Sequence, residues 1–333
     1  MTAPSPRQSL RGFGVERVGK AMRLRTSPLF LDAPFPTEVC FVSHAHADHI
    51  ARHGQTIATA PTLRLLEHRL KTSTTALPVP YGKSFKLGGF SLKLLPAGHV
   101  LGSAQLLATR DDGKRILYTG DFNPVPALAT EAAESARCEV LIIESTFGHP
   151  RFRFPPRDDV YAQMRAFARS TISKGGTPVF LAYTLGKSQE AMRVLADEGL
   201  PLVAHPSIAD ICEIYASFGH SIPHRRFSGT IEEGEVLFLP TGPTSQVQSV
   251  PKARTAMLSG WALESGARYR FGTDEAFALS DHADFDGLLG YVEATGAKRV
   301  LTVHGYAKEL AALLRDRGLD AQPFEPPRQM ELF

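Results

Sequence analysis

Four potential metal ligands lie within six residues of the chain, in the run His44-x-His46-x-Asp48-His49. Imidazole and carboxylate groups bind zinc and related divalent ions at neutral pH. The alternating side chains of His44 and His46 can reach one ion, whereas Asp48 and His49 turn away from it and can reach a second. The run therefore predicts metal binding, because a purely structural role explains one histidine far better than four ligands at this spacing.

Three more candidate ligands occur farther along the chain. His99 follows the apolar stretch 90–95, Asp121 follows residues 115–118 and His304 follows residues 299–301, and each of the three lies beside a glycine. A single histidine at a strand end is more often a hydrogen-bonded structural residue. The three similar placements indicate metal ligands only when they are considered together with the first run. Cys40, Cys138 and Cys212 are scattered without CxxC spacing, so a cysteine zinc site is not expected.

The elements that must hold these ligands are short apolar strands. The β-branched stretch 39–42 immediately precedes the first run, and a rigid strand can direct several side chains of the loop that follows it toward one point. Strand and helix patterns alternate along the whole chain. Helices are expected at residues 62–70, 158–173, 188–198, 208–218, 285–294 and 307–317. Asp284 is expected to cap the fifth of them.

The first run resembles the metal-binding motif of the metallo-β-lactamase superfamily, and several further motifs resemble its β-CASP nucleases over about residues 35–310. These motifs are residues 97–102, the strand ending in Glu144, the segment 181–190, the cluster around His282, and His304. The resemblance implies an α/β fold, a four-layer αββα metallo-β-lactamase sandwich with a short inserted β-CASP-like α/β cap. The expected domains are a loose N-terminal tail (1–19), the metallo-β-lactamase domain (20–152 and 253–320), the cap (153–252) and a C-terminal tail (321–333).

The resemblance also implies the ligand set of a two-metal site. His44, His46 and His99 would hold one ion, Asp48, His49 and His304 the other, and Asp121 would bridge them. Two such ions can clamp a phosphate and activate a bridging hydroxide for hydrolysis. Zinc suits these ligands best, and manganese is the alternative.

The resemblance gives catalytic roles to Asp48, Glu144 and His282. A carboxylate beside an imidazole favours the imidazolium and fixes its orientation. The imidazolium of His282 could then protonate the departing 3′-oxygen of a phosphodiester, with Glu144 orienting it. The alternative is that the two residues form only a structural hydrogen-bonded pair.

Within the family, the chain is most similar to the bacterial ligase-associated DNA exonucleases. The similarity rests on the length of the chain, the Ser-Asp-His-Ala-Asp run at 280–284, the Val-His-Gly-Tyr turn at 303–306 and the Ser-Gly-Trp segment at 259–261. It implies a DNA exonuclease in DNA repair, with DNA ligase and helicase as partners. A β-CASP ribonuclease in RNA processing is the alternative, and a small-molecule hydrolase of the lactonase or thioesterase type is the second alternative.

The composition is that of a water-soluble enzyme, with 333 residues, 43% hydrophobic and 21% charged. A formal net charge of only +3 does not by itself indicate nucleic-acid binding. Arg151 and Lys187 lie next to catalytic motifs and Ser103 follows the His99 turn, so we expect these three to contact substrate phosphate. Solvated surface charge is the alternative for each basic residue.

The C-terminal residues suggest a separate interaction. Gln329, Leu332 and Phe333 follow a proline-rich stretch and resemble the Gln-x-x-Leu-Phe peptides that dock on the bacterial DNA sliding clamp. The alternative is that Leu332 and Phe333 fold back onto the domain. No signal-peptide core or transmembrane run is visible and cysteines are few, so a cytoplasmic location without membrane contact is expected.

Overall fold

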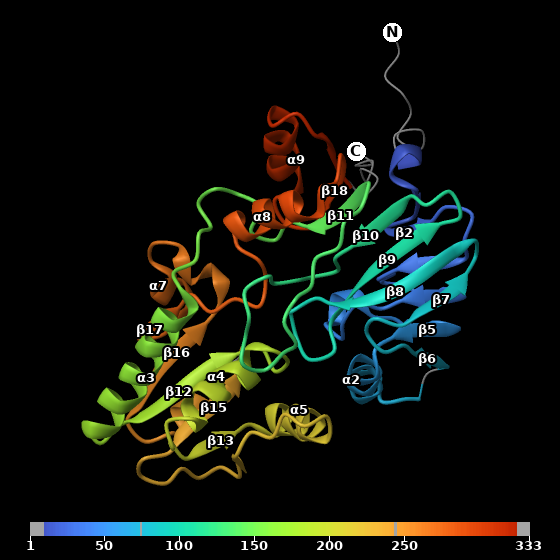
Figure 1. The fold of residues 1–333 in the computed structure, drawn as a ribbon. Coiled ribbons are helices and arrows are strands. Elements are labelled where there is room, and N and C mark those ends of the chain that lie inside the picture. The colour runs from blue at the N-terminus through green and yellow to red at the C-terminus, as the bar shows by residue number, and fades with distance from the viewer. Residues whose placement is uncertain (1–9, 74, 243–244, 325–333) are drawn as a thin grey trace, which may run out of the picture. The chain divides into compact units, whose positions relative to one another are not determined.

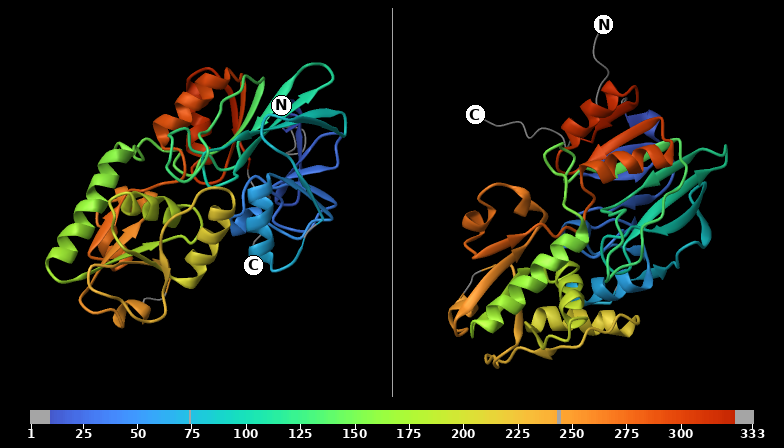
Figure 2. Two further views of the ribbon diagram at one scale, coloured as in Figure 1. Left: turned by 60° about the horizontal axis from the view of Figure 1, so that its bottom comes forward. Right: turned by 60° about the vertical axis from the view of Figure 1, so that its left-hand side comes forward.

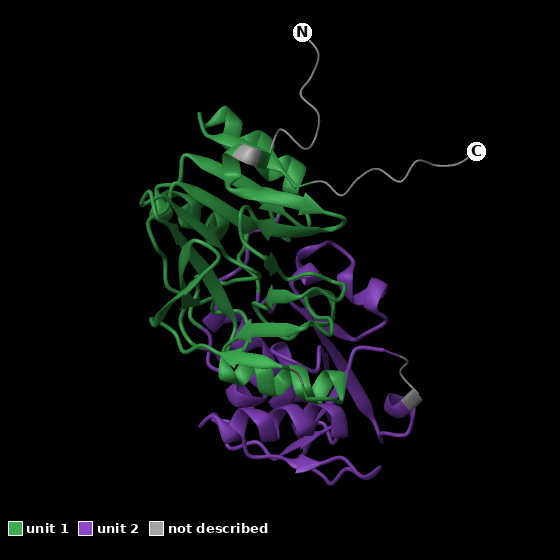
Figure 3. Ribbon diagram, turned by 90° about the vertical axis from the view of Figure 1, so that its right-hand side faces the viewer, with its two compact units in different colours: residues 1–126, 131–151, 282–333 green, residues 127–130, 152–281 purple. Residues whose placement is uncertain are grey.

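The computed structural model describes residues 10–73, 75–242 and 245–324. The chain divides into two compact units, shown in different colours in Figure 3. Unit 1 comprises residues 1–126, 131–151 and 282–333, and unit 2 comprises residues 127–130 and 152–281. Each unit is described by itself below.

The first sheet of unit 1 comes from the N-terminal part of the chain. Its strands, in spatial order, are β1 (Val15–Val18), β2 (Ala21–Leu24), β3 (Leu29–Leu31), β4 (Val39–Phe41), β5 (Gln55–Ala58) and β6 (Ala76–Pro78). The β1/β2 and β2/β3 pairs are antiparallel, and the pairs from β3 to β6 are parallel.

The second sheet of unit 1 joins distant parts of the chain. Its spatial order is β19 (Asp320–Pro323), β18 (Arg299–Val303), β11 (Val140–Glu144), β10 (Arg115–Tyr118), β9 (Ala104–Arg110), β8 (Phe90–Pro96) and β7 (Ser84–Leu87). Strands β11 and β18 pair in parallel with Glu144 opposite Val303, which puts the carboxyl ends of both strands at one edge. Glu144 and His304, which lie 160 residues apart in sequence, are thereby brought to the same edge of the sheet.

Unit 1 has four layers, which Figures 1 and 2 allow the reader to follow. Leu92, Leu106 and Phe41 belong to a buried apolar cluster between the two sheets. Helix α2 (Ala60–Leu70) packs on the outer face of the first sheet through Leu63 and Leu66. Helices α8 (Phe285–Thr295) and α9 (Ala307–Asp316) pack on the outer face of the second sheet. The expected four-layer αββα sandwich is confirmed.

Unit 2 is a parallel sheet with helices on both faces. The strand order is β14 (Arg225–Arg226), β13 (Leu202–Ala204), β15 (Val236–Pro240), β12 (Thr177–Ala182), β16 (Ala253–Leu258) and β17 (Glu275–Phe277). Helices α3 (Arg157–Ser173), α4 (Lys187–Ala196) and α5 (Pro206–Ser217) cover one face, and α6 (Ser245–Gln248) and α7 (Ala267–Phe271) lie on the other. The near-continuous apolar strands β12 and β15 suit a sheet that is covered on both sides.

The expected boundary between cap and returning domain differs from the structure. The sequence placed residues 253–281 in the metallo-β-lactamase domain, but β16 pairs with β12 and β17 pairs with β16, so these residues belong to unit 2. The apolar residues of β16 predict a strand, but they do not indicate which sheet that strand joins. Unit 1 resumes at His282, which is therefore the first residue after the segment that forms unit 2.

Both expected tails are shorter than predicted. Residues 10–13 form the 3-10 helix η1, residues 15–18 form β1, and the side chains of Phe13 and Val15 are buried in the core. At the other end, β19 pairs with β18. Half of the residues of β1 (Val-Glu-Arg-Val) and of β19 (Asp-Ala-Gln-Pro) are polar, so no apolar run marks these two strands in the sequence. Residues 1–9 and 325–333 lie outside the described residues.

All six expected helices are confirmed to within two residues at each end. The Oδ1 atom of Asp284 accepts a hydrogen bond from the N–H of Gly287 at 2.7 Å, as expected of a helix N-cap. The short helices α6 and α7 were not predicted. Among the described residues, no helix combines the length and the apolar character that crossing a membrane requires.

Candidate active site

The centre of the site is a set of three imidazoles in unit 1. The Nδ1 atom of His46 lies 3.0 Å from the Nε2 atom of His44 and 3.0 Å from the Nε2 atom of His99. His44 and His46 lie in the loop after β4, and His99 lies in the turn after β8. The structure thus brings these three predicted ligands together, although the two segments are more than 50 residues apart in sequence.

Asp121 lies between these three imidazoles and His49. Its Oδ2 atom is 3.3 Å from Nε2 of His49, 3.6 Å from Nε2 of His44 and 3.9 Å from Nε2 of His99. Asp121 follows β10 and Gly120, where φ is +54° and a Cβ atom would come within 2.5 Å of the Ser43 side chain. Glycine at position 120 therefore allows the close approach of the two loops that carry Asp121 and His44.

His304 completes a second group with His49 and Asp121. One ligand atom from each of the three residues lies within 4.8 Å of the others, and the rings of His49 and His304 are 5.4 Å apart. The backbone of His304 has φ +62°, an uncommon left-handed conformation for a residue with a side chain. Such strain occurs at functional sites that the surrounding fold holds in place.

Asp48 is the one predicted ligand that stands apart from these groups. Its Oδ2 atom is 3.7 Å from Nε2 of His49, but its side chain is 80% exposed and lies outside the clustered ligand sets. The short 3-10 helix η2 (Ala47–His49) carries both residues, with His49 turned inward and Asp48 outward.

A second pair, Glu144 and His282, adjoins the histidine cluster. The Nδ1 atom of His282 lies 2.9 Å from Oε1 of Glu144. Glu144 is fully buried and accepts hydrogen bonds from the N–H groups of Phe122 at 3.2 Å and Thr146 at 3.1 Å. The His282 ring packs 4.6 Å from the ring of His99, and Asp121, Glu144 and His282 form a further close group. This pair therefore lies beside the candidate metal ligands.

Asp32 is a buried residue of the site that the sequence reasoning missed. Its Oδ2 atom lies 3.0 Å from Nδ1 of His49 and accepts hydrogen bonds from the hydroxyls of Ser43 at 2.6 Å and Tyr118 at 2.7 Å. Its Oδ1 atom accepts from the N–H of Ser43 at 2.7 Å. A carboxylate on the far nitrogen of a ligating histidine fixes the orientation of the ring. The available signal was an acid directly after the apolar strand β3.

Asn123 is a second missed contributor. Its side-chain amide donates a hydrogen bond to the backbone carbonyl of His282 at 3.1 Å, and its own oxygen accepts from the N–H of Val125. The loop that follows Asp121 is thereby connected to the segment that carries His282.

The pKa values of the buried groups in the cluster shift in different directions. Burial, together with the neighbouring His49 and His99, holds the pKa of His44 well below its usual value, so His44 is neutral. Burial opposes a charge on His49, but the carboxylates of Asp121 and Asp32 outweigh it and hold the pKa of His49 well above the usual range. Burial also opposes ionisation of Asp121, yet His49 holds the pKa of that carboxyl well below its usual value.

The donor set fits a divalent ion. Tetrahedral zinc with Zn–N bonds of about 2.0–2.1 Å requires nitrogens about 3.3 Å apart, close to the 3.0 Å separations around His46. Neutral imidazole is the form that ligates metals, and His44 is held in that form. The buried carboxylates of Asp121 and Asp32 favour a positive charge at His49, and a bound cation would supply that charge.

Ser103 supports the turn that presents His99. It is 1% exposed, and its hydroxyl accepts hydrogen bonds from the N–H groups of His99 at 3.1 Å and Val100 at 3.2 Å. Its expected contact with substrate phosphate stays a prediction.

Arg151 and Lys187 differ in the exposure of their side chains to solvent. Arg151 is exposed, lies over the ring of Tyr306 at 5.2 Å and donates a hydrogen bond to the Tyr306 hydroxyl. Lys187 is 5% exposed at the start of α4 and forms an ion pair with the buried Asp281. In this structure the Lys187 ammonium is engaged within unit 2, and its expected contact with substrate stays a prediction. Gln329, Leu332 and Phe333 lie outside the described residues.

Comparisons with known proteins agree with this geometry. A sequence model of the β-lactamase superfamily domain matches residues 12–172. A probable DNA ligase of Opitutus terrae is 40% identical over 307 residues, which cover 91% of this chain and 30% of that protein. An RNase of Saccharolobus solfataricus, RNase aCSPSF2, is 28% identical over 191 residues, covering 48% of this chain and 38% of the RNase.

The 5′ exonuclease Apollo of Gallus gallus is 33% identical over 175 residues, covering 50% of this chain and 38% of the exonuclease. The chain thus matches less than two fifths of the length of each of these three relatives. The crystal structure of an Enterococcus faecalis protein of unknown function shares the fold, with a TM-score of 0.58, 14% identity and coverage of 87% of this chain and 79% of that one. Residues 12–172 of the chain thus form a β-lactamase superfamily domain, and the described residues include His and Asp groups that could hold a metal ion.

Proposed function

We propose that this protein is a metal-dependent phosphodiesterase that hydrolyses nucleic acid, and that it acts as a DNA exonuclease in DNA repair. The observation that carries the proposal is the Glu144–His282 pair beside the histidine and aspartate cluster. The cluster alone would serve any hydrolase of this superfamily. A carboxylate-oriented imidazole next to it adds a proton donor for the leaving group of a phosphodiester.

The proposed ligands divide into two sets that share Asp121. His44, His46 and His99 form the first set, and His49 and His304 the second, with Asp48 close to His49. When bound, two divalent ions would polarise the phosphate and activate water for attack on phosphorus. Zinc is the favoured metal because imidazole nitrogen dominates the donor set, and manganese is the alternative.

The chain's own residues provide the remaining steps. Glu144 holds Nδ1 of His282, which directs the Nε2 nitrogen as the donor of a proton to the departing oxygen. Because Phe122 and Thr146 donate backbone hydrogen bonds to Glu144, the carboxylate is fixed before substrate arrives. Arg151, exposed beside Tyr306, is proposed to contact substrate phosphate.

DNA is the favoured substrate. The 40% identity to a protein named as a probable DNA ligase supports DNA and a DNA ligase partner, whereas a helicase partner is proposed only from the resemblance to ligase-associated exonucleases. A ribonuclease in RNA processing is the alternative, which the similarity to an RNase supports. A lactonase or thioesterase is disfavoured, because the Glu144–His282 pair and the inserted unit 2 resemble the β-CASP nucleases.

The experiment that tests the proposal compares substrates. End-labelled single-stranded DNA and RNA of one sequence, bis(4-nitrophenyl) phosphate and a simple lactone are incubated with the zinc-loaded or manganese-loaded protein. We expect cleavage of DNA and of the phosphate ester, and the position of the label then reveals polarity. Cleavage of RNA alone moves the protein to RNA processing, and hydrolysis of the lactone alone contradicts the proposal.

We also propose that Gln329, Leu332 and Phe333 dock on a bacterial sliding clamp, on the basis of their sequence. Pull-down of the full chain by purified clamp should be lost when residues 329–333 are deleted. Equal retention of the truncated chain would eliminate the interaction.

A further inference from the structure

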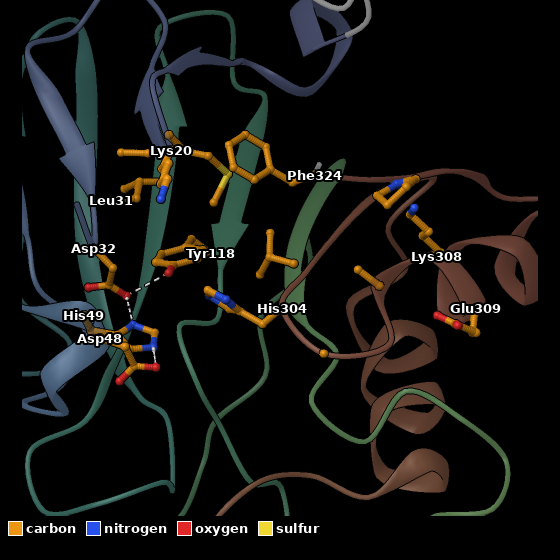
Figure 4. Close-up of a pocket in the computed structure, with 16 residues that line it drawn as sticks. Lys20, Leu31, Asp32, Asp48, His49, Tyr118, His304, Lys308, Glu309 and Phe324 are labelled. Carbon is orange, nitrogen blue, oxygen red and sulfur yellow. Dashed lines mark hydrogen bonds and ion pairs between the residues drawn. The ribbon is translucent and has the colours of Figure 1, made fainter. Parts of the chain in front are cut away.

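The histidines that the proposed chemistry must orient are supported by different parts of the chain. Figure 4 shows Asp32 between His49 and Tyr118, and all three residues belong to unit 1. His282 also belongs to unit 1, but the two residues directly before it in the chain belong to unit 2. The contacts of those two residues therefore help to decide where the His282 backbone, and with it the ring, can point.

Asp281, the residue directly before His282, pairs with a buried lysine. Nζ of Lys187 donates a hydrogen bond to Oδ1 of Asp281, and both side chains are buried. Lys187 is the first residue of α4, and its ammonium lies 5.0 Å from the centre of the Tyr183 ring. The Asp281 carboxylate is thus tied to the start of a helix of unit 2.

Ser280, one residue earlier, is held by a second, largely buried cation. Nη2 of Arg157, the first residue of α3, donates a hydrogen bond to the backbone carbonyl of Ser280 at 2.8 Å. Nη1 of the same guanidinium donates to Oε1 of Glu190, which also accepts a hydrogen bond from the Tyr161 hydroxyl. Two helices therefore hold two successive residues of the chain through two separate cations.

Stability alone does not explain the places of these two cations. The amino-terminal end of a helix disfavours positive charge, yet Arg157 and Lys187 are each the first residue of a helix. A buried ion pair commonly stabilises a fold no more than apolar side chains of similar volume do. What such contacts provide is a fixed geometry, here of the segment that leads into His282.

We propose that Lys187 and Arg157 are positioning residues, which fix residues 280–281 and so direct the His282 imidazole toward the departing oxygen. The inference rests on the proposed nuclease function, in which a proton passes from Nε2 of His282 to that oxygen as its bond to phosphorus breaks. Glu144 holds the His282 ring itself, and the two cations hold the chain just before it. A shift of about 1 Å in a catalytic group can lower the rate by about 10²-fold.

Two variants remove these contacts with little damage to the fold. Lys187→Met combined with Asp281→Leu removes the whole ion pair, so no buried charge is left without its partner. Arg157→Lys keeps a cation for Glu190 but lacks the second arm of the guanidinium, which reaches Ser280. The matched controls alter solvent-accessible ion pairs at the same two helices, and they are Arg193→Met combined with Asp197→Leu, and Arg169→Lys.

Two substrates distinguish orientation of His282 from support of the fold. The departing alkoxide of single-stranded DNA needs a proton, whereas 4-nitrophenolate leaves bis(4-nitrophenyl) phosphate without one. We expect the ratio of kcat on DNA to kcat on the ester to fall about tenfold or more in both test variants and in His282→Ala, and to stay within about twofold in the controls. KM for DNA should change by less than about twofold, because neither cation touches the substrate in this account.

The same substitutions made in the His282→Ala protein give a second, independent readout. Residues that act only through His282 have nothing left to orient there, so we expect no further loss of kcat on DNA. Zinc content and the thermal unfolding midpoint show whether each variant is folded. Arg157→Lys, which retains its charge, keeps the test valid if the variant without the Lys187–Asp281 pair does not fold.

Equal losses on both substrates in the two test variants, or a further loss in the His282→Ala protein, overturn the inference. A raised KM for DNA with unchanged kcat in the variant that lacks Lys187 also overturns it, and supports the contact of Lys187 with substrate phosphate instead. If His282→Ala itself loses both activities equally, the proposed function fails at its proton donor. The failure of the inference and the failure of the proposed function are therefore distinguishable.

Discussion

The Nδ1 atom of His282 lies 2.9 Å from the Oε1 atom of Glu144, although 138 residues separate the two in the chain. Parallel pairing of β11 with β18 places Glu144 at a strand end, and Asn123 holds the backbone of His282 from the loop after Asp121. The pair is therefore fixed by the same elements that fix the metal ligands.

If Glu144 acts only through His282, their substitutions are not additive. We expect His282→Ala to lower kcat by about 10²–10⁴-fold, and Glu144→Gln to lower it less, since a positioned proton donor contributes about that much. The double variant should be no slower than His282→Ala, because the two residues work as a unit. Glu139→Gln, just before β11 and exposed, is the control. Independent, multiplying losses would show that Glu144 has a separate role.

Asp32 is expected to control metal retention. Asp32→Asn removes the charged acceptor on Nδ1 of His49 and weakens the hydrogen bonds from Ser43 and Tyr118. Loss of such a supporting residue typically weakens metal affinity by about 10–100-fold. Zinc competition with a chromogenic chelator measures this, with Asp111→Asn, in an exposed loop, as the control. Unchanged zinc affinity would contradict the idea that Asp32 positions His49 for zinc binding.

The variant Ser103→Ala tests whether the Ser103 hydroxyl supports the turn that presents His99 or contacts substrate phosphate. The variant leaves the buried N–H groups of His99 and Val100 without their acceptor, which costs about 1–3 kcal/mol for each unsatisfied group. We therefore expect a lower unfolding midpoint together with lower kcat. Ser91→Ala, on β8 and half-buried, should change neither. A higher KM with unchanged stability would instead support the phosphate contact expected from the sequence.

The Arg225–Glu235 pair should make the stability of unit 2 depend on pH. A hydrogen bond from Arg225 holds the pKa of Glu235 below its usual value, so its stabilisation is present at neutral pH and disappears as pH falls through the lowered pKa. We expect Glu235→Gln to lower the free energy of unfolding by about 1 kcal/mol at pH 7, and this effect to vanish as the pH falls through the lowered pKa of Glu235. Trp261, the one tryptophan in the chain, lies in unit 2, in the 3-10 helix η3 (Gly260–Leu263), and reports its unfolding in urea. A constant difference across pH would contradict the assignment.

The positions of the candidate ligands could be predicted from the sequence, because each of them follows a short apolar strand that a reader can recognise. His99, Asp121 and His304 stand just past β8, β10 and β18, as expected. The positions of the helices could be predicted equally well, since the apolar period and the Asp284 cap are local features of the sequence.

Contacts between distant residues were not accessible to the same reasoning. Tyr118 reaches Asp32 across 86 residues, and Lys187 pairs with Asp281 across 94, so neither the role of Asp32 nor the burial of Lys187 appears in any local pattern. The assignment of β16 to unit 2 depends on its pairing with β12, which one strand's composition does not encode. The short strands β1 and β19 show the same limit at the two ends of the described chain.

The most direct measurement of the central claim is the rate of single-stranded DNA cleavage as zinc is added back to the metal-stripped protein. The wild type and His282→Ala are compared, with bound zinc measured in the same samples. We predict that the wild type gains activity up to two equivalents of zinc, whereas His282→Ala binds the same zinc and stays about 10²–10⁴-fold slower. Full cleavage by the stripped wild type, or by His282→Ala, would contradict the account.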